Sequence, residues 1–276
     1  MSGLDIRLVG LDVDGTLYNS ARQITPRCQQ AIRDCIRAGC MVVPATGRPW
    51  GGLPREFTSI PGVDWAVTAN GATLVDLAAG KVAERHWMSR EDWFFAWEVT
   101  SGFDRVMDLF LGGWGHSNAD QLDRAEEWAP PGMADYIRAS RRTVEDVRVL
   151  AREQEYIEKA NLFFTDPEQL RTAWRLLEES GRFAVSSSSA VGIELNAKGV
   201  DKAEGLFSLG RRLGIAPEQI MACGDSGNDL PMLRRAGVGV AMGNASPAVK
   251  AAARFVTDTN DNDGVARALE RFVLGR

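Results

Sequence analysis

The sequence is poor in cysteine and in long apolar runs. Its 276 residues include four cysteines without CxxC spacing: Cys28, Cys35, Cys40 and Cys223. This pattern excludes a disulfide-rich secreted scaffold, and we expect reduced thiols. No run of about 18 apolar residues occurs, and none opens the chain, so neither a membrane-spanning helix nor a signal peptide is expected. Together these absences predict a cytoplasmic protein with no membrane partner.

An excess of positive charge and a set of zinc ligands are also missing. The net charge of −5 at pH 7 offers no basic surface for nucleic acid, so an anionic substrate needs a local positive site. His86 and His116 lie thirty residues apart without a cysteine partner, which favours structural or surface roles over zinc binding. The chemistry must therefore come from local motifs.

The first segment alternates between strand and helix patterns. An apolar run at residues 6–11 predicts a buried strand that ends at the turn sequence DVDGT. Thr25 and Pro26 predict the start of a helix that runs to about Ala38, and the run CMVVPA predicts the next strand. Because proline cannot donate to a strand ladder, we expect this strand to end early or to carry Pro44 at a bulge.

The C-terminal segment repeats the same alternation. A helix is expected from Asp201 to about Leu213, then a strand at IMAC, a helix at NDLPMLRRAG, a strand at VGVAM, and helices near Pro247 and Gly264. Such alternation predicts an α/β fold, a Rossmann-like doubly wound parallel sheet with its ligand crevice at the carboxyl ends of the strands.

The middle of the chain has a different pattern and predicts an inserted α+β domain. We expect residues 1–82 and 197–276 to form the catalytic core and residues 83–196 to form the insertion. Helices are expected near residues 89–100, 132–140 and 167–180, and VMDLFL, NLFF and FAVS are strand-like. Six of the eight tryptophans lie in the insertion, and packing in its core is the favoured role for each: Trp87, Trp93, Trp97, Trp114, Trp128 and Trp174.

The motif DVDGT places Asp12 and Asp14 two residues apart, directly after a strand and beside a glycine. One carboxylate can attack phosphorus while its neighbour moves protons, provided that a cation offsets the charge on the phosphoryl oxygens. The structural alternative is a plain turn rich in aspartate and glycine. Taken alone, the motif leaves both interpretations open.

Two further segments offer phosphate donors. In ATGR, Thr46 and Gly47 follow an apolar run, and the Thr46 hydroxyl can donate to a phosphate oxygen or cap a helix. In GVDKAEGL, Lys202 lies at the start of a helix, where backbone amides and the helix dipole favour an anion. Taken alone, a solvated surface position is the more common role for such a lysine.

The segment GDSGND gathers Asp225, Asn228 and Asp229 on one strand-to-helix turn. Hard oxygen ligands at this density suit Mg²⁺. The alternative is a polar turn with a helix cap, although acids so close together repel unless a cation offsets them. The four segments together supply a nucleophile, a general acid/base, hydrogen-bond donors to phosphate and a set of metal ligands. This combination predicts a phosphohydrolase.

On these four motifs the sequence resembles the haloacid dehalogenase superfamily, in its Cof-like branch of sugar-phosphate phosphatases with a type II (IIB) cap. The similarity runs nearly end to end, and NGA at Asn70–Ala72 and VAMGNA at Val240–Ala245 resemble secondary signatures of that branch. Two small departures are Pro44 before TGR and Ala203 after the lysine. Neither departure removes a functional group.

The resemblance implies a role for each motif residue. Asp12 would be the nucleophile and a Mg²⁺ ligand, and Asp14 the general acid/base, with its backbone carbonyl on the metal. Thr46, Gly47, Lys202 and Asn228 would bind the phosphoryl group or the substrate. Asp225 would ligate Mg²⁺ and Asp229 would support it.

The function expected from this resemblance is Mg²⁺-dependent hydrolysis of small phosphomonoesters, sugar phosphates foremost, through an aspartyl-phosphate. Two alternatives remain open at this stage. A sugar phosphomutase would use the same core and return the phosphoryl group to the sugar, and a non-catalytic regulatory protein would bind a phosphorylated ligand without turnover.

Overall fold

The computed structural model describes residues 5–276, and in this range the chain forms two compact units. The core unit comprises the described residues up to Gly47, with Leu53–Glu84 and Asp201–Arg276. The inserted unit comprises Arg48–Gly52 and Arg85–Val200. The chain therefore crosses from one unit to the other four times, once directly after Gly47.

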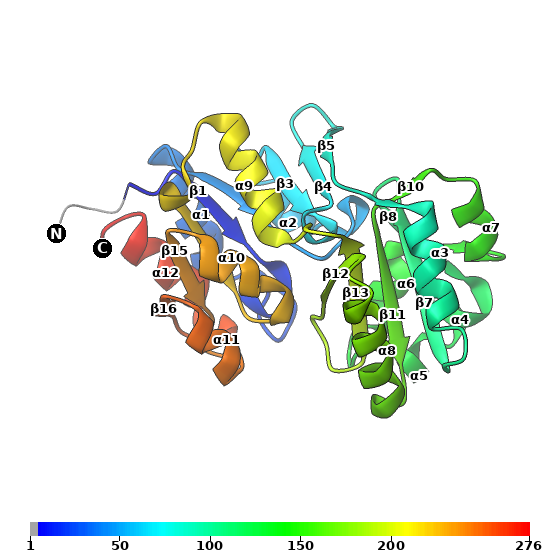
Figure 1. Ribbon diagram of the computed structural model, residues 1–276. Coiled ribbons are helices and arrows are strands. Elements are labelled where there is room, and N and C mark those ends of the chain that lie inside the picture. The colour runs from blue at the N-terminus through cyan, green and yellow to red at the C-terminus, as the bar shows by residue number, and fades with distance from the viewer. Residues whose placement is uncertain (1–4) are drawn as a thin grey trace. The chain divides into compact units, whose positions relative to one another are not determined.

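A parallel sheet in the order β16-β15-β14-β1-β2 forms the centre of the core unit (Figure 1). Its strands are β1 (Leu8–Leu11), β2 (Met41–Pro44), β14 (Ile220–Gly224), β15 (Val238–Ala241) and β16 (Phe255–Val256). β1 pairs in parallel with β2 on one side and with β14 on the other. The strand order thus reverses beside β1, and ligands of α/β folds bind in the crevice at such a reversal.

Helices cover both faces of this sheet because its strands are apolar on both sides. Val9 and Leu11 pack on the face of α1 (Pro26–Arg37) and α12 (Gly264–Phe272). Leu8 packs on the opposite face, with apolar residues of α9 (Lys202–Leu213). The predicted doubly wound α/β fold is confirmed. The core unit has three shorter helices as well: α2 (Arg55–Thr58), α10 (Leu230–Arg235) and α11 (Pro247–Ala252).

Two long core helices start at or within one residue of the predicted positions, and each follows a capping residue. The Thr25 side chain accepts a hydrogen bond from the Cys28 amide at 3.1 Å, ahead of Pro26 at the first helical position. The Asp201 side chain accepts from the Glu204 amide at 2.7 Å. Each bond satisfies an amide that the first turn leaves without a helical partner.

Of the two alternatives expected at Pro44, the structure shows the early end: β2 ends at Pro44, in regular register opposite Leu11, and this part of the described chain has no bulge. The Met41 amide donates to the carbonyl of Arg7, directly before β1, and the Ala45 amide donates to the carbonyl of Leu11, at the end of β1. In a strand, alternate amides point to opposite sides, so the position of Pro44 points away from β1 and costs no bond to it. Ala45 also forms a parallel bridge with Val67. Val67 lies in a second sheet of the order β3-β4-β5, made of β3 (Trp65–Thr68), β4 (Thr73–Asp76) and β5 (Lys81–Arg85).

The inserted unit contains a mixed sheet in the order β12-β13-β11-β7-β8-β9. In that order its strands are β12 (Phe183–Ser186), β13 (Gly192–Ala197), β11 (Lys159–Phe164), β7 (Arg105–Leu111), β8 (Trp114–Asn118) and β9 (Arg141–Val144). Its pairs are antiparallel except for β8 and β9, which are parallel. A short antiparallel pair joins β6 (Met88–Ser89) to β10 (Tyr156–Ile157).

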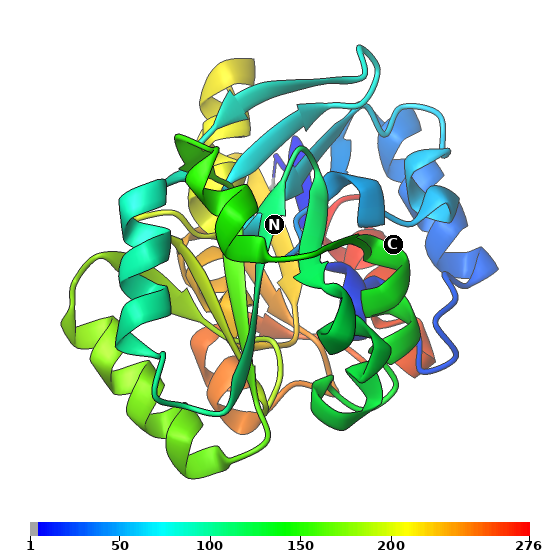
Figure 2. The same cartoon turned by 90° about the vertical axis from the view of Figure 1, so that its right-hand side faces the viewer.

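Apolar side chains on one face of this sheet pack with α3 (Arg90–Val99), α7 (Val147–Arg152) and α8 (Pro167–Glu179), which lie together in Figures 1 and 2. The other helices of the unit are α4 (Ala119–Asp123), α5 (Ala125–Trp128) and α6 (Ala134–Ser140). Trp93 and Trp128 are buried in apolar clusters, in the packing role expected of the tryptophans. Among residues 5–276, no helix is long and apolar enough to cross a membrane.

Candidate active site

The predicted motifs of the core unit follow the carboxyl ends of its parallel strands. Asp12 follows β1, Thr46 lies two residues after β2, and Asp225 follows β14 directly. Lys202 is the first residue of α9. Because parallel strands end at the same edge of a sheet, residues far apart in sequence meet there.

The turn Val13–Leu17 after Asp12 depends on Gly15. This glycine has a φ of +80°, and a Cβ at its position would lie 2.5 Å from Oδ2 of Asp225. Only glycine meets both demands without strain. The Asn244 Nδ2 donates to the Gly15 carbonyl at 2.8 Å, and the Thr16 hydroxyl donates to Oδ1 of Asp225 at 2.8 Å. These two hydrogen bonds connect the DVDGT motif to the segments that follow β14 and β15.

Lys202 joins two carboxylates from different motifs. Its Nζ donates to Oδ1 of Asp12 and to Oδ1 of Asp229, at 2.7 Å in each case, and only 1% of the residue is exposed. Burial by itself lowers the pKa of Lys202, but the two carboxylates raise it above its ordinary value, so the ammonium stays charged. A solvated surface position, the more common role of a lysine taken alone, does not apply to Lys202, because two partners compensate its burial.

Asp229 also supports the backbone of its own turn. Its Oδ2 accepts from the amides of Asp225 and Ser226, at 2.9 and 3.0 Å. Burial and the neighbouring Asp229 carboxylate raise the pKa of Asp225 to about 7. Burial also raises the pKa of Asp12, while Lys202 opposes that shift. Burial is the main cause of both shifts, and neighbouring carboxylates add to each of them. With three carboxylates and one ammonium, the cluster has an excess of negative charge.

This excess fits a divalent cation. One carboxylate oxygen each of Asp12, Asp225 and Asp229 lies within 4.8 Å of the others. Three carboxylates face one ammonium, and hard oxygen donors of this kind suit Mg²⁺. The group contains no oxygen of the Asp14 side chain, which is half-buried on the same turn as Asp12.

A second polar group links the ATG motif to the GDSGND motif through Asn70. Thr46 is buried, its amide donates to the Val67 carbonyl at 2.9 Å, and its carbonyl accepts from the Asn70 amide at 3.0 Å. The Asn228 Nδ2 donates to Oδ1 of Asn70 at 3.2 Å. Gly47 follows Thr46 as the last residue of this core segment.

Asn70 lies in the secondary signature NGA and was not among the predicted site residues, although it connects Thr46 and Asn228, two residues predicted to bind phosphate or substrate. Its backbone adopts a left-handed conformation, with φ +57° and ψ 37°. Asparagine tolerates this conformation better than most residues. The signal for a functional position was its place in NGA, directly after the strand β3.

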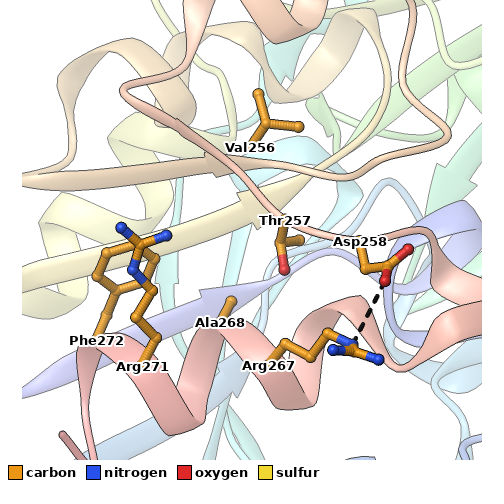
Figure 3. Close-up of a pocket in the computed structure, with 7 residues that line it drawn as sticks. All are labelled: Val256, Thr257, Asp258, Arg267, Ala268, Arg271 and Phe272. Carbon is orange, nitrogen blue, oxygen red and sulfur yellow. Dashed lines mark ion pairs between the residues drawn. The ribbon is translucent and has the colours of Figure 1, made fainter. Parts of the chain in front are cut away.

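A separate hollow of about 400 Å³ lies beside α12 in the core unit (Figure 3). Arg271 lies near Phe272 there, and Arg267 forms an ion pair with Asp258, 3.5 Å from Nε to the nearer carboxylate oxygen. The remaining lining residues are Val256, Thr257 and Ala268. None of the predicted site residues lines this hollow.

Comparisons with known proteins agree with this fold. The model of the family described as haloacid dehalogenase-like hydrolase matches residues 9–269. The 5-amino-6-(5-phospho-D-ribitylamino)uracil phosphatase YcsE of Bacillus subtilis is 30% identical over 271 residues, which cover 98% of this chain and 97% of that protein.

Two solved structures have the same fold. A haloacid dehalogenase-like hydrolase from B. subtilis has a TM-score of 0.82 at 27% identity and covers 96% of this chain and 99% of its own. A subclass IIB sugar phosphatase of the superfamily has a TM-score of 0.82 at 24% identity and covers 96% and 98%.

Fold and sequence together define a phosphoric monoester hydrolase. The chain belongs to the haloacid dehalogenase-like hydrolase family, and its fold matches that of a subclass IIB phosphatase. The predicted family and the predicted enzyme class are thereby confirmed.

Proposed function

We propose that this phosphatase depends on Mg²⁺ and hydrolyses small phosphomonoesters, sugar phosphates foremost, through a phosphoryl group bound covalently to Asp12. The observation that carries the proposal is the position of Asp12 at the end of β1. Its carboxylate accepts from Lys202 at 2.7 Å and shares a cluster within 4.8 Å with Asp225 and Asp229. An ionised carboxylate beside a fixed cation is suited to attack on phosphorus.

The first chemical step forms a bond between an Asp12 oxygen and phosphorus and breaks the bond from phosphorus to the leaving oxygen. Asp14 donates a proton to that oxygen, so the alcohol leaves neutral. Lys202 favours the ionised form of Asp12 and orients it before the attack, and it offsets negative charge on the phosphoryl group during the attack.

The second step releases phosphate. Asp14, now a carboxylate, takes a proton from water while the water oxygen attacks phosphorus, and the bond from Asp12 to phosphorus breaks. The products are inorganic phosphate and the original Asp12 carboxylate. Thr46, Gly47 and Asn228 contact the phosphoryl group or substrate in both steps.

Asp12, Asp225 and the backbone carbonyl of Asp14 would hold Mg²⁺, with Asp229 in support. When bound, Mg²⁺ offsets the charge of the phosphoryl oxygens and of the carboxylates. The inserted unit selects the substrate, and its size favours small esters over polypeptides. The cytoplasmic location stays a prediction.

A phosphate-release assay across sugar phosphates, nucleotides, phosphoamino acids and phosphopeptides, with and without a chelator, tests the proposal. We expect sugar phosphates to give the highest kcat/KM and the chelator to stop release. Acid quenching during turnover of a ³²P-labelled substrate should leave label on the wild-type protein and none on Asp12→Asn. Phosphopeptide cleavage faster than that of every sugar phosphate, or full activity in chelator, would contradict it. Transfer of label to a second position of the sugar without phosphate release would indicate the mutase instead.

A further inference from the structure

The five residues after the predicted phosphate-binding pair Thr46 and Gly47 belong to the inserted unit, not to the core. The chain leaves the core unit after Gly47, runs through Arg48–Gly52 and returns at Leu53. Within the inserted unit, the Gly51 amide donates to the Gly113 carbonyl at 2.7 Å. This short bond ties the segment to the turn between β7 and β8.

Trp114 presses directly on the backbone of Gly51. A Cβ at Gly51 would lie 2.4 Å from Cε2 of the Trp114 ring. No real side chain fits within that distance, so glycine is required here by close approach. On the other side of the contact, a Cβ at Gly113 would lie 3.2 Å from Cβ of Trp50. The backbone of Gly51 therefore packs against Trp114, and the backbone of Gly113 packs against Trp50.

Tyr136 of α6 holds the ends of the same segment. The Arg48 guanidinium lies over the Tyr136 ring, 4.2 Å from its centroid, and Arg48 Nη1 donates to the Gly52 carbonyl at 3.0 Å. A Cβ at Gly52 would lie 3.0 Å from the Tyr136 hydroxyl. An arginine stacked on an aromatic ring and bonded to backbone has little freedom to move.

We propose that Trp114 and Tyr136 are positioning residues for phosphate binding, which act through the backbone of Arg48–Gly52 on Thr46 and Gly47. The peptide bond between Gly47 and Arg48 is planar, and successive Cα atoms stay 3.80 Å apart. A shift of Arg48 must therefore be absorbed by the backbone torsions of Gly47 and Thr46. The core side fixes Thr46 through Val67 and Asn70, so the inserted unit supplies the second of two anchors.

The consequence differs from that of ordinary substrate selection. A residue that contacts the leaving group changes affinity for some substrates and leaves the affinity for inorganic phosphate unchanged. A residue that positions Thr46 and Gly47 changes the affinity for phosphate itself, and for every ester by a similar factor. The inference rests on the proposed function, since it assigns phosphate binding to Thr46 and Gly47.

The experiment measures the inhibition constant of inorganic phosphate and kcat/KM for three phosphate esters with different leaving groups. The variants are Trp114→Ala, Trp114→Phe and Gly51→Ala, and Trp174→Ala is the control. Trp174 is a half-buried residue of α8 in the same unit, and it packs against the apolar cluster between that helix and the mixed sheet. Circular dichroism and the Tm of each variant establish that it is folded.

We expect Trp114→Ala and Gly51→Ala to weaken phosphate inhibition about tenfold and to lower kcat/KM for all three esters by a similar factor, because small misplacements of contact groups are costly. Trp114→Phe keeps a ring against Gly51 and should recover most of the loss. Trp174→Ala should leave the inhibition constant unchanged.

An unchanged inhibition constant in folded Trp114→Ala and Gly51→Ala would overturn the inference, as would a loss confined to one ester. In that case the proposed function would still stand if Asp12→Asn abolishes turnover in the same experiment, and only the positioning role of Trp114 and Tyr136 would be rejected. Wild-type protein that releases no phosphate from any ester would overturn the proposed function, and this inference with it.

Discussion

Each unit buries a cluster of charged side chains, and the two clusters differ in balance. In the core unit, Asp12, Asp225 and Asp229 form one group, and Lys202 pairs with two of them, Asp12 and Asp229. In the inserted unit, one face of the mixed sheet carries two matched pairs, listed here with their distances: Arg141 with Asp108 at 3.0 Å and Lys159 with Glu194 at 2.9 Å. The first cluster has an excess of acid, and the second has one base for each acid.

The pairs of the inserted unit satisfy one another in detail. Oδ2 of Asp108 accepts from Nε and Nη2 of Arg141 at 3.1 and 3.0 Å, and its Oδ1 accepts from the Asn161 amide at 3.0 Å. Burial lowers the pKa of Lys159, and the Glu194 carboxylate opposes that shift. Both Arg141 nitrogens donate to the same Asp108 oxygen, and the other Asp108 oxygen is occupied by the Asn161 amide. Hydrogen bonds between two charged groups, as here, are stronger than those between neutral groups.

A buried cluster with excess negative charge and a buried cluster with matched charges have different consequences for the protein. Matched buried pairs add little net stability, because desolvation offsets their attraction, but breaking one of them is costly. A buried excess of carboxylates is unfavourable until a cation binds, which makes it a site for function. Substitutions in the charged cluster of the core unit should therefore mainly change activity. Substitutions in the charged cluster of the inserted unit should mainly change stability.

The largest effect is expected from Asp12→Asn. The change removes the nucleophile, so turnover of sugar phosphates should fall below about 1% of wild type. The fold should be retained, because one buried negative charge is removed and the side chain keeps its size. Phosphate release and the Tm measure the two outcomes. Activity well above that level would contradict the assignment of Asp12.

Next in size is the loss from Arg141→Met, which leaves Asp108 buried without its cation. We expect the free energy of unfolding to fall by about 3–5 kcal/mol. The double variant Arg141→Met with Asp108→Leu should recover most of it, because no unpaired charge then remains. Urea unfolding followed by tryptophan fluorescence measures both. A double variant no more stable than the single one would show that the pair itself contributes the stability.

A smaller effect is expected from Mg²⁺ binding. At a Mg²⁺ concentration a hundred times its Kd, wild-type protein should gain about 2.7 kcal/mol over protein in chelator. Asp225→Asn should be more stable than wild type in chelator, because it relieves repulsion among buried carboxylates. The same variant should gain little from Mg²⁺. A wild-type Tm that does not respond to Mg²⁺ would show that the carboxylates of the core unit do not form a cation site.

Local sequence predicted several features because their causes are local. Thr25 and Asp201 cap helices through residues three positions away, and strand ends are marked by DVDGT and GDSGND. The polar segment GGWGHSNADQ (residues 112–121) has no strand pattern, yet five of its residues form β8. Trp114–Asn118 is a strand because β7 and β9 pair with it on both sides, a condition that no local pattern contains.

What the sequence by itself determined is the set of chemical groups and the strand ends that carry them. The tertiary structure decided which groups meet: Lys202 bonds to Asp12 across 190 positions of the chain, and Asn70 joins Asn228 across 158. It also decided that Arg48–Gly52 packs in the inserted unit. Capping and turns depend on neighbours in sequence, whereas buried ion pairs and close backbone contacts depend on the packing of whole elements, which only the folded chain defines.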